Sequence, residues 1–389
     1  MQVTLISSIA DIDAAQWNAL TGAHIPYLRH EFLLALEASD CVAAATGWLP
    51  KHCLFYDADG CLFAAAPQYI KQHSYGEYVF DWAWADAYHR AGLSYYPKLV
   101  NAIPFTPSSS PRLLVSERAL ATFGGEIWQT LGQAYLKEAQ FWCKELSLSS
   151  VHVLFPPNEE HNAVMYQHWL EREQCQYHWH NKGYEHFDDF LTGLSSSRRK
   201  NIRKERKRLH EKGLHYDWVK AGTLSSEQRE LFFRCYEATY HERGQLPYLN
   251  RAFFAQIFDT LPDQVHLVFA YDAANHVIAS ALYLCDLGSD DTLYGRYWGC
   301  LHSYDFLHFE LCYYQGIEFC ITHGIKRFDA GAQGEQKLLR GFEPVKTISY
   351  HYLEHEPFRH AVSNFLEEER EHIERYREDA LRWLPYKKQ

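Results

Sequence analysis

The chain has 389 residues, with 38 Lys or Arg against 49 Asp or Glu, and a formal net charge of −11. Its apolar fraction of 47%, with 27 Tyr, 23 Phe and 11 Trp, excludes a disordered chain and is typical of a globular protein large enough for two domains. The negative charge disfavours contact with nucleic acid or anionic membranes over most of the surface, so any polyanion would need a local positive site.

The N-terminal segment and the cysteines predict the compartment. The opening MQVTLISSIADIDAAQW has no basic region followed by an apolar run, and no window approaches the roughly eighteen apolar residues of a membrane span. The ten Cys are scattered singly, without a CxxC pair. We therefore expect a cytoplasmic protein without a membrane span, whose thiols are reduced.

A segment of the first half of the chain is repeated in the second half. After amphipathic helices expected near residues 13–22 and 30–38, the segment YDADGCLFAAAPQYI from Tyr56 matches YDAANHVIASALYL from Tyr271, at an offset of about 215 residues. Each segment predicts a strand, a tight turn and a second strand. The same offset places EYVFDWAWA (77–85) over TLYGRYWGC (292–300), which predicts two third strands, although short hairpins can also look alike by chance.

The second part of the repeat follows at a different offset. Residues 134–155 resemble residues 311–331, and both show helical periodicity that changes to a short buried strand. Between the matched parts, the first half carries about forty extra residues around 92–115, where Pro and Ser predict a loop. Helices near 225–244 and 250–261 precede the second hairpin.

The order of elements predicts the fold class. Each half runs strand, helices, antiparallel hairpin with a third strand, helix and strand, which indicates a mixed sheet flanked by helices. We predict an α/β protein of two tandem domains of the GNAT (acyl-CoA N-acyltransferase) kind. The expected domains are residues 1–182 and 183–389, and a charged amphipathic helix near 365–384 is expected to close the C-terminal domain.

The stretch SSSRRKNIRKERKRLHEKG (195–213) concentrates nine Lys or Arg against two Glu in an acidic chain. A Ser of 195–197 can cap a helix that Gly213 ends, and Ile202 and Leu209 would form a thin apolar stripe. The basic residues predict either a solvated face or contacts with phosphates of a polyanionic donor or acceptor. The leading phosphate-binding candidates are Arg199, Arg203 and Arg206.

Two segments carry a resemblance to known proteins. The basic stretch resembles the segment that opens the second domain of the FemABX family, tandem-GNAT aminoacyltransferases that use aminoacyl-tRNA to build peptidoglycan cross-bridges. The run RYWGCLHSYDFLHFELCYYQGIEFCITHGIKRFDAGAQGEQKLLRGFEP (296–344) resembles the FemAB-like family labelled peptidoglycan biosynthesis/recognition. The resemblance implies the tandem-GNAT fold and an acyltransferase activity. The second half shows no long coiled-coil insertion like that of the tRNA-dependent enzymes.

The candidate site lies in the C-terminal half, where the strands 292–300 and 325–331 would splay apart around an acyl donor. Amine acylation needs a base, donors for an oxyanion, and groups that orient the reactants. The segment DAGAQGEQKLLRGFEP combines glycines with charged residues, although a plain strand–turn–helix connection would look similar. Arg296 stands in an otherwise aromatic strand, where it would bind substrate or form a structural pair with Asp329. The candidate catalytic residues are Glu335, Asp329 and His302, and the candidate substrate-binding residues are Arg296, Tyr297, His308, Glu310, Gln333, Lys337 and Arg340.

These residues favour one function and leave alternatives. A zinc site of His302, His308 and Cys312 is conceivable, but we predict no metal site and no tightly bound cofactor. The usual GNAT loop for acyl-CoA, [QR]xxG[GA], is missing after residue 300, which favours a FemABX-like mode over a standard acetyltransferase.

We expect an N-acyl- or aminoacyltransferase that acts on an amine of a peptide, amino acid or cell-wall precursor, with aminoacyl-tRNA or acyl-CoA as the donor and a possible tRNA or nucleotide-phosphate contact. The alternatives are a non-catalytic protein that binds a cell-wall or phosphate-bearing ligand, and an RNA-binding module centred on the basic helix.

Overall fold

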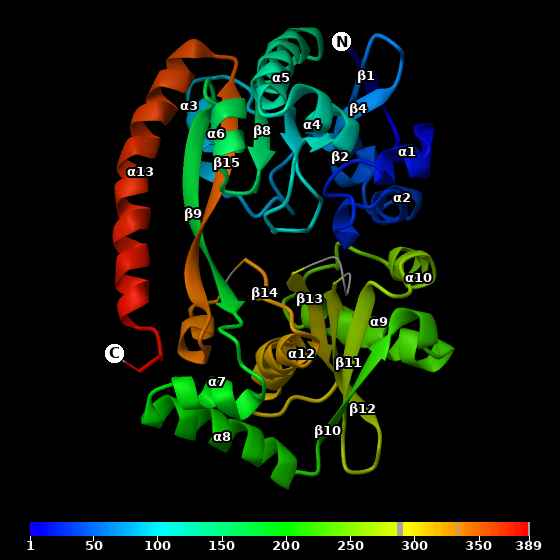
Figure 1. The fold of residues 1–389 in the computed structure, drawn as a ribbon, viewed down its shortest axis with the longest axis vertical. Helices are drawn as coiled ribbons and strands as arrows, with labels where there is room; N and C mark the ends of the chain where they lie inside the picture. Colours follow the sequence, from blue (N-terminus) through cyan, green and yellow to red (C-terminus); the bar gives the residue numbers. More distant parts are fainter. Residues whose placement is uncertain (286–290, 333, 388–389) are drawn as a thin grey trace. The chain divides into compact units, whose positions relative to one another are not determined.

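The computed structural model describes residues 1–285, 291–332 and 334–387 (Figure 1). The chain forms two compact units: unit 1 contains residues 1–175 and 346–376, and unit 2 contains residues 176–345 and 377–389. Two strands, β9 (Leu170–His180) and β15 (Glu343–Leu353), and helix α13 (Glu356–Arg382) each pass from one unit into the other. Within the described part of the chain, none of the helices combines the length and apolar character needed to cross a membrane.

Unit 1 contains two sheets. One has the strand order β1-β3-β4-β7, and the strands β15-β8-β6-β5-β2 follow one another in the second. Helix α5 packs its apolar face, which includes Leu131, Tyr135 and Trp142, on the main core of this unit. The elements are β1 (Gln2–Ile6), α1 (Ala14–Asn18), α2 (His30–Ala38), β2 (Trp48–Pro50), β3 (His52–Tyr56), β4 (Leu62–Ala66), β5 (Gln68–Lys71), α3 (Trp82–Arg90), β6 (Lys98–Asn101), β7 (Leu114–Val115), α4 (Glu117–Phe123), α5 (Glu126–Glu145), β8 (Ser150–Leu154) and α6 (Glu160–Met165).

Unit 2 has the strand order β10-β11-β12-β13-β14-β9. All neighbouring strands are antiparallel except β13 and β14, which are parallel and are joined through the helical segment α11–η5–α12. The elements are α7 (Phe187–Gly193), α8 (Ser196–Glu211), β10 (His215–Lys220), α9 (Ser226–His241), α10 (Arg251–Thr260), β11 (Val265–Tyr271), β12 (Val277–Leu284), β13 (Thr292–Cys300), α11 (Leu307–Phe309), the π-helix η5 (Glu310–Tyr314), α12 (Gln315–His323), β14 (Arg327–Asp329) and the 3₁₀ helix η6 (Glu335–Arg340).

Helices cover both faces of the unit 2 sheet. Tyr297 of β13 packs its ring against Tyr236 of α9, whereas its neighbour Trp298 packs against His308 of α11. Because successive side chains of a strand point to opposite faces, α9 and the α11–α12 segment lie on opposite faces, as Figure 1 shows for α9 and α12. Gly299 permits this arrangement, since a Cβ there would lie 1.7 Å from the backbone oxygen of Cys235 in α9.

The repeated hairpin is confirmed. The strands β3–β4 and β11–β12 are antiparallel, and both ladders shift register at the matching residues Tyr56 and Tyr271. In each turn the aspartate that follows the tyrosine accepts two backbone N–H bonds: Asp57 Oδ1 accepts from Asp59 and Cys61, and Asp272 Oδ1 accepts from Ala274 and His276. The predicted helices before each hairpin and the helix–strand segments after it are present as well.

Two details of the sequence-based organisation need correction. Residues 77–85 do not form a third strand, because Trp82–Arg90 is helix α3; the strand that pairs with β4 is instead β7. The expected loop at 92–115 contains the strands β6 and β7. The predicted C-terminal helix is present: Val362 and Leu366 of α13 pack with Trp84 and Tyr88 in unit 1, whereas residues 377–389 belong to unit 2, so its closure of the C-terminal domain stays a prediction. The domain boundary near 180–190 stays a prediction, and the compact units divide the chain differently.

Candidate functional site

A cavity of about 430 Å³ opens in unit 2 where β13 and β14 separate. The two strands pair only from Thr292 to Tyr294, opposite Arg327 to Asp329, and the cavity begins at the next residue of β13. Its lining residues are Ala281, Leu282, Tyr283, Gly295, Arg296, Tyr297, Trp298, His308, Phe309, Cys312, Tyr313, Ala330, Gly334, Gln336 and Lys337. The Arg296 strand and the glycine-spaced turn thus line the same cavity.

A β-bulge shapes the β13 wall. Ala281 of β12 pairs with Trp298 but Tyr283 pairs with Gly295, so Arg296 and Tyr297 share a single partner position. Bulges leave backbone groups outside the regular ladder and redirect side chains, and they are frequent next to active sites. The bulge therefore turns Arg296 toward the cavity.

Arg296 is the main charged group of the β13 wall. Its side chain is 3% exposed, Nη1 donates to the backbone oxygen of Gly295 (2.7 Å), and Nη2 donates to Asp329 Oδ2 (3.3 Å). Among the described residues, nothing accepts a hydrogen bond from its buried Nε. A buried donor without an acceptor is costly, so this atom is suited to an oxygen of a ligand.

Asp329 holds Arg296 from β14. It is buried, its Oδ1 accepts the backbone N–H of Gly331 (2.8 Å), and His178 Nε2 lies 3.9 Å from the same oxygen. Burial is the main cause that lowers the pKa of His178 to about 4, so this ring is neutral near pH 7. Asp329 therefore contacts Arg296 and is not among the residues that line the cavity.

Lys337 lies on the opposite wall in η6. It is 1% exposed, and Nζ donates to the backbone oxygen of Gly331 (2.5 Å). Burial, which Asp329 partly offsets, lowers the pKa of Lys337 to about 8. The residue before η6, Gly334, has a φ of 115°, a conformation that side chains rarely adopt.

The helical segment supplies the aromatic wall. Phe309, Cys312 and Tyr313 follow an i, i+3, i+4 spacing across the π-helical turn η5, a feature often found at functional sites. His308 packs edge-on against Trp298 (4.9 Å between ring centroids), and burial, followed by Arg340 and Lys337, lowers its pKa to about 4. Burial raises the pKa of the Cys312 thiol, so it is protonated near neutral pH.

The remaining predicted residues lie elsewhere. Glu335 and His302 are exposed and are not among the residues that line the cavity, and Gln333 lies outside the described residues. Arg340 is buried behind the wall, where its guanidinium stacks 3.4 Å from the Phe309 ring centroid and pairs with Glu205. Within the described ranges, no cluster of three or more His, Cys, Asp or Glu side chains could hold a metal ion.

The basic helix α8 has the predicted ends and apolar stripe. It begins after Ser195, whose hydroxyl makes no capping bond, and it buries Ile202 and Leu209. Arg206 is fixed by Glu310 (3.0 Å) and Glu318 (2.8 Å), so buried Glu310 anchors α8 and does not line the cavity. Arg203 pairs with Asp188 (2.8 Å) and Arg199 is half-buried. Two of the three phosphate-binding candidates thus already have carboxylate partners.

Sequence reasoning missed most of the aromatic lining. The spacing of Phe309, Cys312 and Tyr313 on one helix face was a readable signal. Tyr283 and Gly295 could not be found this way, because they line the cavity as a cross-strand pair of β12 and β13, which helical spacing does not indicate.

The architecture defines the class: an α/β protein with two tandem GNAT-like domains, whose second sheet splays at a parallel strand pair. The sequence matches the model of the FemAB-like family, described as peptidoglycan biosynthesis/recognition, over residues 8–388. The chain belongs to this family, as the resemblance of the basic stretch and of residues 296–344 implied. No curated protein sequence matches the chain.

Three solved structures align with the chain at low sequence identity, one of them with a TM-score above 0.5. The C-terminal domain of a putative lysylphosphatidylglycerol synthetase from Agrobacterium fabrum aligns with a TM-score of 0.51 and 8% identity, over 91% of this chain and 96% of that chain. L-PGS from Bacillus licheniformis aligns with a TM-score of 0.48 and 10% identity, over 86% and 96%. A tandem GNAT protein from the clavulanic acid biosynthesis pathway aligns with a TM-score of 0.46 and 10% identity, over 91% and 98%. The predicted fold class is confirmed.

Proposed function

We propose that the cavity of unit 2 transfers an acyl or aminoacyl group to an amine of a peptide, amino acid or cell-wall precursor. The observation that carries this proposal is the pair of buried cations that line one cavity: Arg296, whose Nε lacks an acceptor among the described residues, and Lys337, whose pKa burial lowers to about 8. Membership of a family described as peptidoglycan biosynthesis/recognition supports a cell-wall amine as the acceptor.

The reaction assigns a role to each group. The acceptor amine forms a bond to the acyl carbon, and the bond from that carbon to the ester or thioester leaving group of the donor breaks. Neutral Lys337 takes the proton that the amine loses and passes it to the departing oxygen or sulfur, which leaves with the bonding electron pair as an alcohol or thiol. Arg296 Nε donates to the oxyanion that develops on the acyl oxygen. Asp329 keeps the Arg296 guanidinium in place.

The aromatic walls bind the organic part of the substrates. Trp298, Phe309 and Tyr313 present apolar ring surface around the two cations. Such a site separates the reactive carbonyl from water, which strengthens the hydrogen bond from Arg296. The donor is either aminoacyl-tRNA or acyl-CoA, and no cofactor has to remain bound between turnovers.

A substrate panel tests the proposal. The full chain is incubated with acyl-CoAs, charged tRNAs and UDP- or lipid-linked muropeptides, and product is measured by mass spectrometry. We expect turnover with one donor class, a loss of about 10²–10⁴-fold in Lys337→Met, and no comparable loss in the exposed-site control Lys326→Met.

The pH profile tests the role of Lys337 as base. Since only the neutral amine accepts a proton, kcat/KM should rise with pH and level off above about 8. A flat profile between about pH 6 and 9, or full activity in Lys337→Met, would overturn this role. Ligand binding without turnover by any donor would instead support the non-catalytic alternative.

A further inference from the structure

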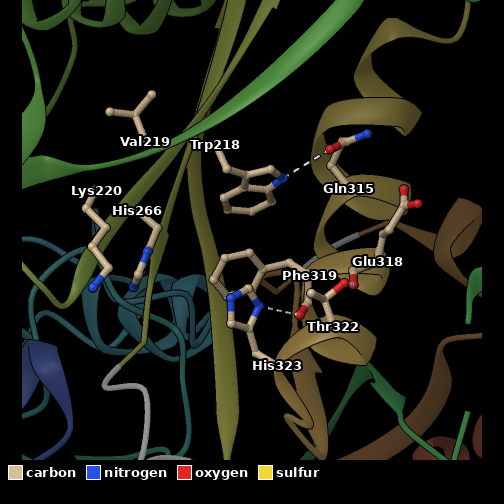
Figure 2. Close-up of a pocket in the computed structure, with 9 residues that line it drawn as sticks. All are labelled: Trp218, Val219, Lys220, His266, Gln315, Glu318, Phe319, Thr322 and His323. Atoms are coloured by element: carbon tan, nitrogen blue, oxygen red, sulfur yellow. Dashed lines mark hydrogen bonds between the residues drawn. The ribbon is translucent and has the colours of Figure 1, made fainter. Parts of the chain in front are cut away.

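A second pocket of unit 2, of about 360 Å³, lies between β10, an edge strand of the described sheet, and α12 (Figure 2). It shares no lining residue with the cavity of Arg296. Its lining residues are Trp218, Val219, Lys220, His266, Gln315, Glu318, Phe319, Thr322 and His323.

Aromatic rings form the apolar wall. Phe319 lies between Trp218 (4.3 Å between ring centroids) and His323 (4.1 Å), and His266 of β11 meets Phe319 edge-on at 5.3 Å. Figure 2 shows His266 and Lys220 on one side of the pocket and the three stacked rings on the other. The stack can hold an apolar group of a ligand.

The hydrogen-bond donors of this wall are already used inside the protein. Trp218 Nε1 donates to Gln315 Oε1 (3.0 Å), the Thr322 hydroxyl donates to the backbone oxygen of Glu318 (2.9 Å), and His323 Nδ1 donates to that of Phe319 (2.9 Å). Because Nδ1 of His323 is occupied by this bond, Nε2 is the ring nitrogen that can contact a ligand.

His266 provides a buried acceptor. The residue is 3% exposed, and its Nε2 has no partner among the described residues. Burial lowers the pKa of His266 to about 4, and a hydrogen bond to the Cys285 backbone acts in the opposite direction. The ring is therefore neutral near pH 7, and a proton on Nδ1, engaged by this bond, leaves the Nε2 lone pair as the unsatisfied atom.

We propose that this pocket binds a primary ammonium group carried on a small apolar or aromatic body. The ammonium donates to the acceptors His266 Nε2 and His323 Nε2, while the ring stack covers the body. The Glu318 carboxylate, whose Oε2 accepts from Arg206 (2.8 Å), adds negative charge at the rim. A carboxylate would instead meet lone pairs and the charge of Glu318. At the mouth, Lys220 is offset by Asp263 at 3.3 Å.

Calorimetric titration of the full chain at pH 7.5 tests the proposal with three probes of matched shape. We expect 2-phenylethylamine to bind saturably, 2-phenylethanol to bind at least fivefold more weakly, and 3-phenylpropionate not to bind. Arg296→Lys should leave the affinity for the amine unchanged, which separates this site from the proposed transfer cavity.

Variants of the pocket identify the contacts. Loss of a hydrogen bond to a charged group should weaken amine binding about 10–100-fold in His266→Leu, whereas the exposed control His302→Leu should bind normally. Because His266 is buried, Glu318→Gln on the half-exposed rim provides an independent variant, for which we expect a loss of about three- to tenfold. Equal or tighter binding of 3-phenylpropionate, or unchanged amine affinity in both His266→Leu and Glu318→Gln, would overturn the proposal.

Discussion

Each unit buries an arginine beside a parallel strand pair, and the two arginines differ in how their donors are satisfied. In unit 1, where β6 and β8 are parallel, Arg112 donates through Nε to the backbone oxygen of Leu154, through Nη1 to the carbonyl and hydroxyl of Ser110, and through Nη2 to the carbonyl of Ser108. In unit 2, Arg296 has partners for Nη1 and Nη2, but none for Nε among the described residues.

The difference separates a structural arginine from one that can bind a ligand. Burial lowers the pKa of Arg112 to about 10, and each of its nitrogens donates to a neighbouring oxygen of unit 1. Arg296 has an unsatisfied hydrogen-bond donor, Nε, among the described residues, and it lines a cavity of about 430 Å³. A buried arginine is therefore evidence for a site only where an unsatisfied donor and open volume occur together.

Removing Arg112 should produce the largest effect on stability. Arg112→Met leaves the carbonyls of Leu154, Ser108 and Ser110 without this donor, so we expect the free energy of unfolding to fall by about 3–6 kcal/mol. Arg118→Met is the matched control, because Arg118 is exposed and its ion pair with Asp57 stabilises little. Denaturant titrations measure both variants, and equal midpoints would show that Arg112 is not a structural strut.

Replacing Arg296 should affect catalysis more than stability. Arg296→Lys keeps a cation beside Asp329 but removes the Nε donor, so kcat/KM should fall about 10–100-fold while the free energy of unfolding falls by about 1 kcal/mol. The control is Arg327→Lys on the adjacent strand, where Arg327 bonds Thr292 and does not line the cavity. A large loss of stability with unchanged kcat/KM would make Arg296 the counterpart of Arg112.

Acid should destabilise unit 1 through a buried histidine pair. His152 Nδ1 and His351 Nδ1 lie 2.6 Å apart, and each Nε2 lies 2.8 Å from a serine hydroxyl, that of Ser150 or Ser349. Burial, with further contributions from Lys98 and Arg172, lowers the pKa of His152 to about 3 and that of His351 well below its ordinary value.

The sign of this effect follows from proton uptake. Between about pH 6.5 and 3, these two histidines bind protons in the unfolded chain but not in the folded protein. The free energy of unfolding therefore falls as pH falls, by about 1.4 kcal/mol per pH unit for each histidine. In His351→Phe we expect the slope of unfolding free energy against pH to decrease by one such increment. An unchanged slope would mean that the pair is already protonated in the folded state.

Local patterns predicted most elements of the fold, and non-local charges explain the failures. The alternating aromatics of 77–85 indicated a strand, but Trp84 and Tyr88 bury one face of helix α3 at an i, i+4 spacing. Asp81, just before that helix, contacts Lys98 of β6, together with Glu77. Such an ion cluster joins segments that no local pattern connects.

The sequence predicted part of the candidate site, and it failed where ion pairs between distant segments decide the position of a side chain. Arg296 and Lys337 line one cavity because the predicted strands 292–300 and 325–331 are neighbours in the sheet. Arg296 lies in the first strand, and Lys337 lies in η6, which follows the second. Glu310 and Arg340 do not line the cavity, because Glu310 pairs with Arg206 and Arg340 pairs with Glu205. Both partners are on α8, more than a hundred positions away in the sequence. The charges of Glu310 and Arg340 suggested a functional role from the sequence, whereas their ion pairs indicate that these side chains hold α8 in place.

The smallest effect is expected at Glu335, which the sequence favoured as the catalytic base. Its side chain is exposed at the start of η6, two positions before buried Lys337, and it is not among the cavity-lining residues. Glu335→Gln should therefore change kcat/KM by no more than about twofold, as expected for a surface substitution. Assays of Glu335→Gln and Lys337→Met side by side compare an exposed and a buried charged residue of the same short helix. A loss above tenfold in Glu335→Gln would transfer the role of base to this carboxylate and leave Lys337 as a binding cation like Arg296.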